Sequence, residues 1–175
     1  MNVYELNLNG KEHLKSMYSI YVIVLNNNME KYYYIGQTGD RKHLSARSPF
    51  YRLTGHLDKQ ESSTQNQIYK GIMEKILKIK YDKNTYENVE NYFENLQLKM
   101  YNFPIFEFNY NATNEEHTEK RQIVEVIENI LLNELAKIIG KNKIINKKYS
   151  SIITIDENIN EKVKNILEYI LEKES

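Results

Sequence analysis

The sequence predicts an α+β fold, in which a small, mainly antiparallel sheet of about three strands is flanked by helices. Two observations support this prediction. Short runs of β-branched and aromatic residues stand at 18–25, 31–36 and 103–110, as is typical of strands. Elsewhere, apolar residues recur every three or four positions, as on the buried face of a helix. A length of 175 residues suits one core, and we interpret residues 1–175 as a single domain.

The first two strands should form a hairpin. Their runs at 18–25 and 31–36 are separated by a short polar segment that begins with three asparagines, and a short turn joins antiparallel strands. In the first run the residues that alternate with Tyr21 are as apolar as those on its own side. We therefore expect a central strand that is covered on both faces.

A helix should begin after Ser48, whose hydroxyl can cap it, with Pro49 at its first position. Arg52 and His56 are four residues apart and so share one face of this helix. The residues expected to face inward are Phe50, Leu53 and Leu57.

The segment 58–101 is predicted to be helical. Thr64 to Gln67 fits a capping box, and apolar residues recur from Ile68 to Ile79 over about four turns. A second apolar stripe consists of Tyr86, Val89, Phe93, Leu96 and Met100. We interpret this region as a helical insertion.

The third strand, at 103–110, contains Pro104 near its start, which favours an edge position or the opening of a strand, because proline cannot donate a ladder hydrogen bond. A long helix should then run from about Glu115 to Ile139 and end at Gly140. Its predicted core stripe is Ile123, Ile127, Ile130, Leu131, Leu135 and Ile138.

The segment 157–173 predicts a last amphipathic helix that contributes no catalytic residue. Its apolar stripe needs burial, either against the rest of the chain or against a second copy. The stripe is short for a dimer interface, which favours a monomer, with a homodimer as the alternative. Its members are Ile159, Val163, Ile166, Leu167 and Ile170.

The overall charge gives no sign of a nucleic-acid partner, because 24 Lys and Arg balance 24 Asp and Glu. Between Lys31 and Gln60, however, the sequence contains six basic and two acidic residues, which gives a local net charge of +4. The chain has no cysteine, and its longest mainly apolar stretch, 18–25, has eight residues, too short to cross a membrane. We expect a cytoplasmic protein with no membrane segment.

Five motif elements, in the right order, resemble the signature of the GIY-YIG nuclease family. The first motif is Ser19-Ile20-Tyr21 and the second is Tyr34-Ile35-Gly36. The family's arginine, followed four residues later by histidine or tyrosine, corresponds to Arg52 and His56. On the long helix, Glu128 precedes Asn129-Ile130-Leu131-Leu132 and resembles the family's catalytic glutamate.

The resemblance covers residues 18–57 and 103–146, where Asn146 is similar to an asparagine that helps to order the family's site. It assigns Gly36 and Gln37 to the same ordering role. The region 58–101 then becomes an insertion and 157–173 a C-terminal extension.

The resemblance implies hydrolysis of a nucleic-acid phosphodiester, above all DNA, with one Mg²⁺ or Mn²⁺. Tyr21 or Tyr34 would take the proton of the attacking water, tuned by His56 and the other tyrosine. Arg52 would steady the phosphate and, with the metal, favour the phenolate. Glu128 would hold the metal.

Three alternatives stay open. Ser19 stands where the family has glycine and Gln37 where one branch has lysine, so a non-catalytic nucleic-acid-binding module is the alternative function. A tyrosine-rich interaction domain that binds neither metal nor nucleic acid is the third interpretation. Among nucleases, a restriction or defence enzyme is favoured over a repair or mobile-element enzyme.

Two further assignments are also open: the role of the basic loop residues and the choice of glutamate on the long helix. Arg41, Lys42 and Arg47 lie in an extra loop, where they either contact the nucleic-acid backbone or are ordinary loop charges. On the long helix, Glu125 has polar neighbours and fits the surface. Glu134 lies between Ile130 and Ile138, so the pattern of burial does not exclude it as the metal ligand.

Overall fold

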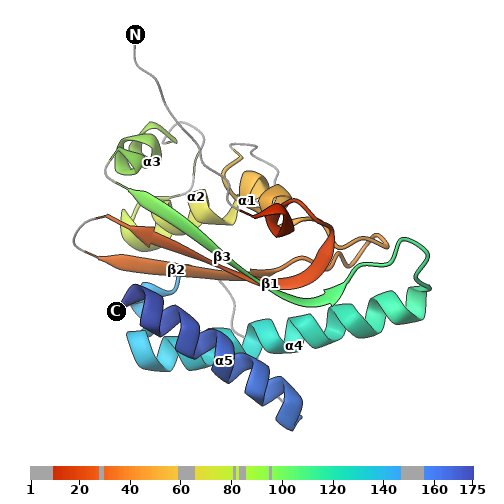
Figure 1. Cartoon of the computed structure of the whole chain (residues 1–175). Coiled ribbons are helices and arrows are strands. Elements are labelled where there is room, and N and C mark those ends of the chain that lie inside the picture. Colours follow the sequence, from red (N-terminus) through yellow and green to blue (C-terminus); the bar gives the residue numbers. More distant parts are fainter. Residues whose placement is uncertain are drawn as a thin grey trace.

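The protein is a three-stranded antiparallel sheet with helices on both faces, which confirms the α+β prediction (Figure 1). The computed structural model describes residues 10–27, 30–58, 66–80, 82, 86–94, 96–146 and 156–175. One face of the sheet carries α1 (Pro49–His56), α2 (Gln67–Gly71) and α3 (Tyr86–Phe93), and the other carries α4 (Asn114–Ile139) and α5 (Glu157–Glu174). None of the helices in these residues is long and apolar enough to cross a membrane.

The sheet has β1 (Met17–Asn26) in its centre, between β2 (Lys31–Gln37) and β3 (Gln97–Glu107). The register of the hairpin places Tyr21 opposite Gly36 and Ile23 opposite Tyr34. The side chains of β1 are buried from Met17 to Leu25, so the predicted central strand, covered on both faces, is confirmed.

Alternation along β1 divides the interior into two cores. Ile20, Val22 and Val24 pack with α4 and α5, whereas Tyr21, Ile23 and Leu25 pack on the other face. The second core is completed by residues of the helical region, including Ile68, Ile72 and Val89. Each face of the hairpin therefore has its own cover.

Strand β3 corrects two boundaries of the sequence prediction. It begins at Gln97, so Met100, predicted to be helical, pairs with Ile23 instead. The long open edge of β1 explains this, since its backbone groups need partners and pairing in the sheet overrides a local helical pattern. At the other end β3 stops at Glu107 rather than at 110. The predicted edge position of Pro104 is confirmed.

The region between α1 (Pro49–His56) and β3 contains shorter helices than predicted. These are α2 (Gln67–Gly71), a π-helical turn η2 (Ile72–Ile76) and α3 (Tyr86–Phe93). The predicted capping box includes Thr64 and Gln65, which lie outside the described residues. The four-turn helix is wrong at its end, because Ile79 lies beyond η2. A hydrogen bond from Leu77 N to Ile72 O, 2.8 Å long, closes the wide turn.

Helix α4 (Asn114–Ile139) matches the predicted long helix and ends at Gly140, whose φ of 92° favours glycine. A capping box that the sequence analysis missed starts it, with Thr113 and Glu116 as partners. Ile138 was assigned to the core stripe, but its side chain is 56% exposed. It lies in the last turn of α4, where the helix reaches the end of the core.

Helix α5 (Glu157–Glu174) packs within the chain, against α4, as expected. Val163, Ile166 and Ile170 are buried in the core that α4 shares. The buried Glu174 carboxylate at its end forms ion pairs with Lys31 and Lys99 of the sheet, at 3.2 and 3.1 Å. The C-terminal helix is therefore part of the fold.

Truncation of Ile170 tests this conclusion. Ile170→Ala is expected to lower the free energy of unfolding by about 2–5 kcal/mol, because the side chain is buried and leaves a cavity. Ile138→Ala is the matched control and should change it by less than about 0.5 kcal/mol. Urea unfolding measures both variants, and equal losses would contradict the described packing of α5.

Candidate active site

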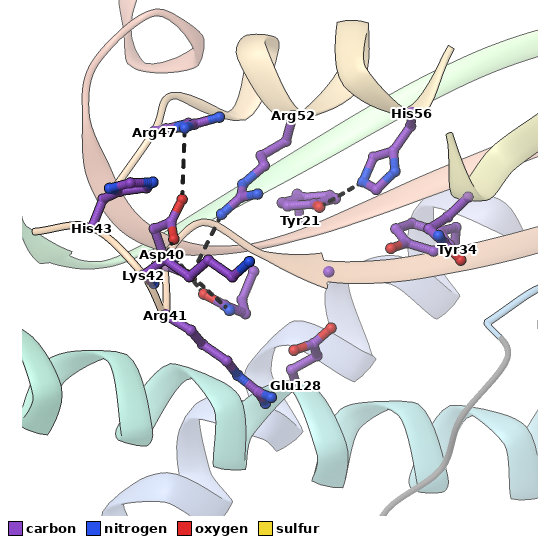
Figure 2. A pocket seen from close by; sticks show the side chains of 14 residues that line it. Tyr21, Tyr34, Asp40, Arg41, Lys42, His43, Arg47, Arg52, His56 and Glu128 are labelled. Carbon is purple, nitrogen blue, oxygen red and sulfur yellow. Dashed lines mark hydrogen bonds and ion pairs between the residues drawn. The ribbon is translucent and has the colours of Figure 1, made fainter. Parts of the chain in front are cut away.

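A pocket of about 490 Å³ opens where β2 ends, and all five residues of the predicted catalytic set line it (Figure 2). The distant motif elements thus converge on one concave site. Figure 2 shows Arg52 and His56 pointing down from α1 and Glu128 pointing up from α4. The lining residues are Tyr21, Tyr34, Gly36, Gln37, Gly39, Asp40, Arg41, Lys42, His43, Arg47, Arg52, His56, Gln67 and Glu128.

Two tyrosines and a histidine form the inner wall of the pocket. The Tyr21 hydroxyl and His56 Nε2 are hydrogen-bonded at 2.7 Å. The Tyr34 ring meets the His56 ring edge to face, with 4.6 Å between centroids. All three residues are at most 9% exposed, so only a small part of each side chain faces the pocket.

The backbone between the tyrosines explains two of the ordering residues. A side chain on Gly36 would overlap the Tyr21 ring, so glycine is required there. Asn146 lies behind the strand, where its Oδ1 accepts from Ile35 N at 2.9 Å and its Nδ2 donates to Ile35 O at 2.7 Å. This reciprocal pair holds the strand segment that carries Tyr34 and Gly36, although Asn146 itself does not line the pocket.

Arg52 is fixed by the backbone that follows β2. Its Nη2 donates to Thr38 O at 3.0 Å and to Gly39 O at 3.4 Å. Its buried Nε has no hydrogen-bond partner among the described residues. Gln37 stabilises the same turn, since its Nε2 donates to Gly39 O at 3.0 Å. The guanidinium keeps unused donors for an anion in the pocket.

Glu128 reaches the pocket from the opposite side of the sheet. Helix α4 packs on the face away from Tyr21 and Tyr34, yet Glu128 lines the same pocket at the end of β2. Within the described residues its carboxylate makes no hydrogen bond or ion pair. Burial, followed by repulsion from Glu125, raises the pKa of Glu128 to about 8, against weaker attraction from Arg41 and Arg52.

Burial also raises the pKa of both tyrosines well above the usual value. Arg52 lowers the pKa of each phenol, as the sequence analysis expected, but burial is the larger effect. In the protein without a metal ion, burial therefore outweighs Arg52, and both phenols favour the protonated form. Tyr21 is left as a hydrogen-bond partner of His56.

The basic loop borders the pocket, and its charges are partly paired. Arg41 Nε donates to Glu125 Oε1 at 2.8 Å, and Arg47 lies 3.7 Å from Asp40. Lys42 is exposed. Glu125, interpreted as an ordinary surface residue, in fact joins Arg41 to Arg121, whose Nη1 is 2.6 Å away. Sequence offered no signal for this pairing, because Arg41 and Glu125 are 84 positions apart.

The donor set suits one weakly chelated divalent cation. The described residues contain no group of three or more His, Asp or Glu side chains that could hold a metal. Mg²⁺ accepts such a site, since it often binds one or two carboxylates and completes its shell with water and substrate phosphate. Glu128 fits this role because its carboxylate faces the pocket without a protein partner among the described residues.

Comparison with known proteins found no matching family model, no matching curated protein and no matching solved structure. The GIY-YIG resemblance remains a prediction, and the function is inferred from the pocket itself.

Replacing the Glu128 carboxylate should stabilise the protein in alkaline solution. An unfolded glutamate has a pKa near 4.5, whereas the pKa of Glu128 in the fold is about 8. Between these values rising pH favours the unfolded state, because the folded protein resists losing the proton. Glu128→Gln should therefore raise the free energy of unfolding above about pH 8 and leave it unchanged below about pH 4.

Urea unfolding over this pH range measures the effect. Glu134→Gln is the matched control, since Glu134 lies on the same helix and pairs with Lys137 at the surface. It should follow the pH dependence of the wild type. If the stability of Glu128→Gln also followed the wild-type pH dependence, the Glu128 carboxylate would not be desolvated.

Proposed function

We propose that this protein is a metal-dependent endonuclease of the GIY-YIG type that hydrolyses DNA phosphodiester bonds, with a restriction or defence role. One observation carries the proposal: Tyr21, Tyr34, Arg52, His56 and Glu128 line a single pocket although they come from two strands and two helices. Together they offer groups that phosphodiester hydrolysis can use: proton-transfer groups, a positive charge for the phosphate and a carboxylate for a metal ion.

Proton transfer is assigned to Tyr21 and His56. Because the phenol keeps its proton in the protein alone, Tyr21 accepts a proton from the attacking water while it passes its own to His56 Nε2, 2.7 Å away. This relay leaves a neutral phenol and a charged imidazole, and it avoids a free phenolate in a buried site. Tyr34, against the His56 ring, holds that ring in place.

Charge that develops on the phosphate is met by Arg52, whose backbone contacts at Thr38 and Gly39 hold the guanidinium before substrate arrives. Glu128 would hold Mg²⁺ or Mn²⁺, and the bound ion would supply Lewis-acid stabilisation of the phosphate oxygens. Glu128 is deprotonated by such binding, so metal affinity should rise with pH up to about 8.

Nucleic acid is the partner that best fits the rim. Arg41, Lys42 and Arg47 border the pocket mouth, and phosphate contacts by such groups supply most of the affinity of nucleic-acid-binding proteins. The preference for DNA over RNA and the cytoplasmic location come from the resemblance and from composition. Packing of α5 within the chain favours a monomer.

A non-catalytic nucleic-acid-binding module is the second candidate. The raised pKa of Tyr21 and of Tyr34 favours it, since a buried neutral phenol is a poor base. Ser19 and Gln37, which depart from the family motifs, favour it too. Both candidates predict nucleic-acid binding, but cleavage occurs only in the first.

Cleavage of plasmid DNA with Mg²⁺ or Mn²⁺ separates them. The wild type should nick or cut, Glu128→Ala should lose cleavage, and Glu134→Ala should retain it. Affinity measured by fluorescence anisotropy should change little in either variant, since it rests on basic groups. Cleavage by Glu128→Ala, or none by wild type that binds DNA, would reject the enzyme assignment.

Binding should depend on salt through the basic loop. The double variant Arg41→Gln, Lys42→Gln should weaken binding uniformly across sequences and lower the slope of log affinity against log salt by about 0.9 for each phosphate that the variant no longer neutralises. Lys164→Gln on α5, where the lysine side chain is 72% exposed, is the matched control and should leave the slope unchanged. An unaltered slope in the double variant would place the DNA elsewhere.

A further inference from the structure

A buried histidine outside the pocket contacts the loop that borders it. His117, in the first turns of α4, is 5% exposed. Its Nε2 lies 2.8 Å from Asp40 O, and its Nδ1 lies 2.6 Å from the hydroxyl of Tyr18 on β1. One ring thus joins the sheet and α4 to the segment after β2, and the proposed chemistry uses none of these three groups.

The partners fix the state of the ring. A carbonyl oxygen only accepts, so Nε2 carries a hydrogen and donates to Asp40 O. In a neutral ring Nδ1 is then an acceptor, and the Tyr18 hydroxyl donates to it. Every polar group in this buried network of Tyr18, His117 and Asp40 is satisfied in that single arrangement.

Asp40 is the centre of the pocket loop, defined here as residues 38–47. Its amide donates to Ser45 O at 2.9 Å, and its carboxylate accepts from Lys42 N at 2.8 Å. Gly39, just before it, forms an isolated bridge with Ala46. A movement of Asp40 would therefore carry the whole pocket loop, including Arg41 and Arg47.

The pocket loop is held through three successive backbone carbonyls, which accept hydrogen bonds from two different helices. Arg52 of α1 binds those of Thr38 and Gly39, and His117 of α4 binds that of Asp40. Because α4 also carries Glu128, the contact from His117 sets the position of the pocket loop relative to that carboxylate. Arg41 adds a contact to Glu125, but its side chain is 76% exposed, where an ion pair is weak.

We infer that His117 is a positioning residue that anchors the pocket loop to α4 and so holds its basic side chains in place for a nucleic-acid backbone. The inference rests on the proposed function for its ligand. The anchoring itself is a property of the fold, and it can be measured without any ligand.

The experiment compares His117→Leu, which removes both hydrogen bonds, with Tyr18→Phe. The second variant also leaves a buried polar atom unpaired, but it keeps the donor to Asp40 O. Hydrogen exchange at the Asp40 amide should be faster in His117→Leu than in Tyr18→Phe by roughly fivefold, the value of one ordinary hydrogen bond. His117→Gln, which can still present a donor towards Asp40, should restore slow exchange.

Binding and kinetics give the second readout. In His117→Leu the KM for an oligonucleotide should rise roughly fivefold with kcat little changed, because contacts to the backbone act equally in the ground and transition states. Tyr18→Phe should retain the wild-type KM. If wild-type protein neither binds nor cuts nucleic acid, the proposed function fails, while the exchange data still decide the anchoring.

The anchoring is overturned if exchange at Asp40 is the same in His117→Leu and Tyr18→Phe. Should His117→Leu fail to fold, NMR of the ring nitrogens in the wild type decides the question, because it shows which nitrogen of His117 carries the hydrogen. A protonated Nε2 and a bare Nδ1 support the contact with Asp40 O, and the opposite tautomer excludes it.

Discussion

Alternation of side chains along β1 governs the architecture of the whole chain. A strand in the centre of a sheet presents successive residues to opposite faces, and β1 is apolar on both. Two covers are therefore needed, one from α4 and α5 and one from the helical region after α1. Tyr21 and Tyr34 fall on the second face, so their hydroxyls are buried beneath α1.

The pocket forms at the end of the sheet, where β2 stops. Where β2 ends, Gly36 and Gly39 present no side chains, and groups from both layers approach one another. Arg52 and His56 enter from α1, whereas Glu128 enters from α4 on the far side. Because the pocket lies at the end of the sheet, the Glu128 carboxylate and the tyrosine hydroxyls can line it together, although the sheet separates the elements that carry them.

Electrostatics in this pocket follow from desolvation more than from pairing. Burial raises the pKa of Glu128 and of the two tyrosines, and the nearby arginines offset only part of that effect. Such a site costs stability, and perturbed pKa values of this kind are typical of functional sites. Arg41 and Arg47 pair with carboxylates, whereas the Arg52 guanidinium is held by the carbonyl oxygens of Thr38 and Gly39. The charge is therefore left for a ligand.

Residues close together in the sequence were enough to predict the local structure, whereas the candidate site residues were named by the family resemblance. The hairpin, the cap at Ser48 and the long helix ending at Gly140 depend on near neighbours, and the motif order identified Tyr21, Arg52 and Glu128. Features that depend on distant partners were decided by the tertiary structure. Gln97 to Asn102 became a strand because β1 needed an edge partner. Glu125 and His117 contact the loop after β2 only because α4 crosses beneath it, and the pKa of each phenol depends on what covers it. Local propensity cannot encode such contacts, since they arise between segments that meet only in the folded chain.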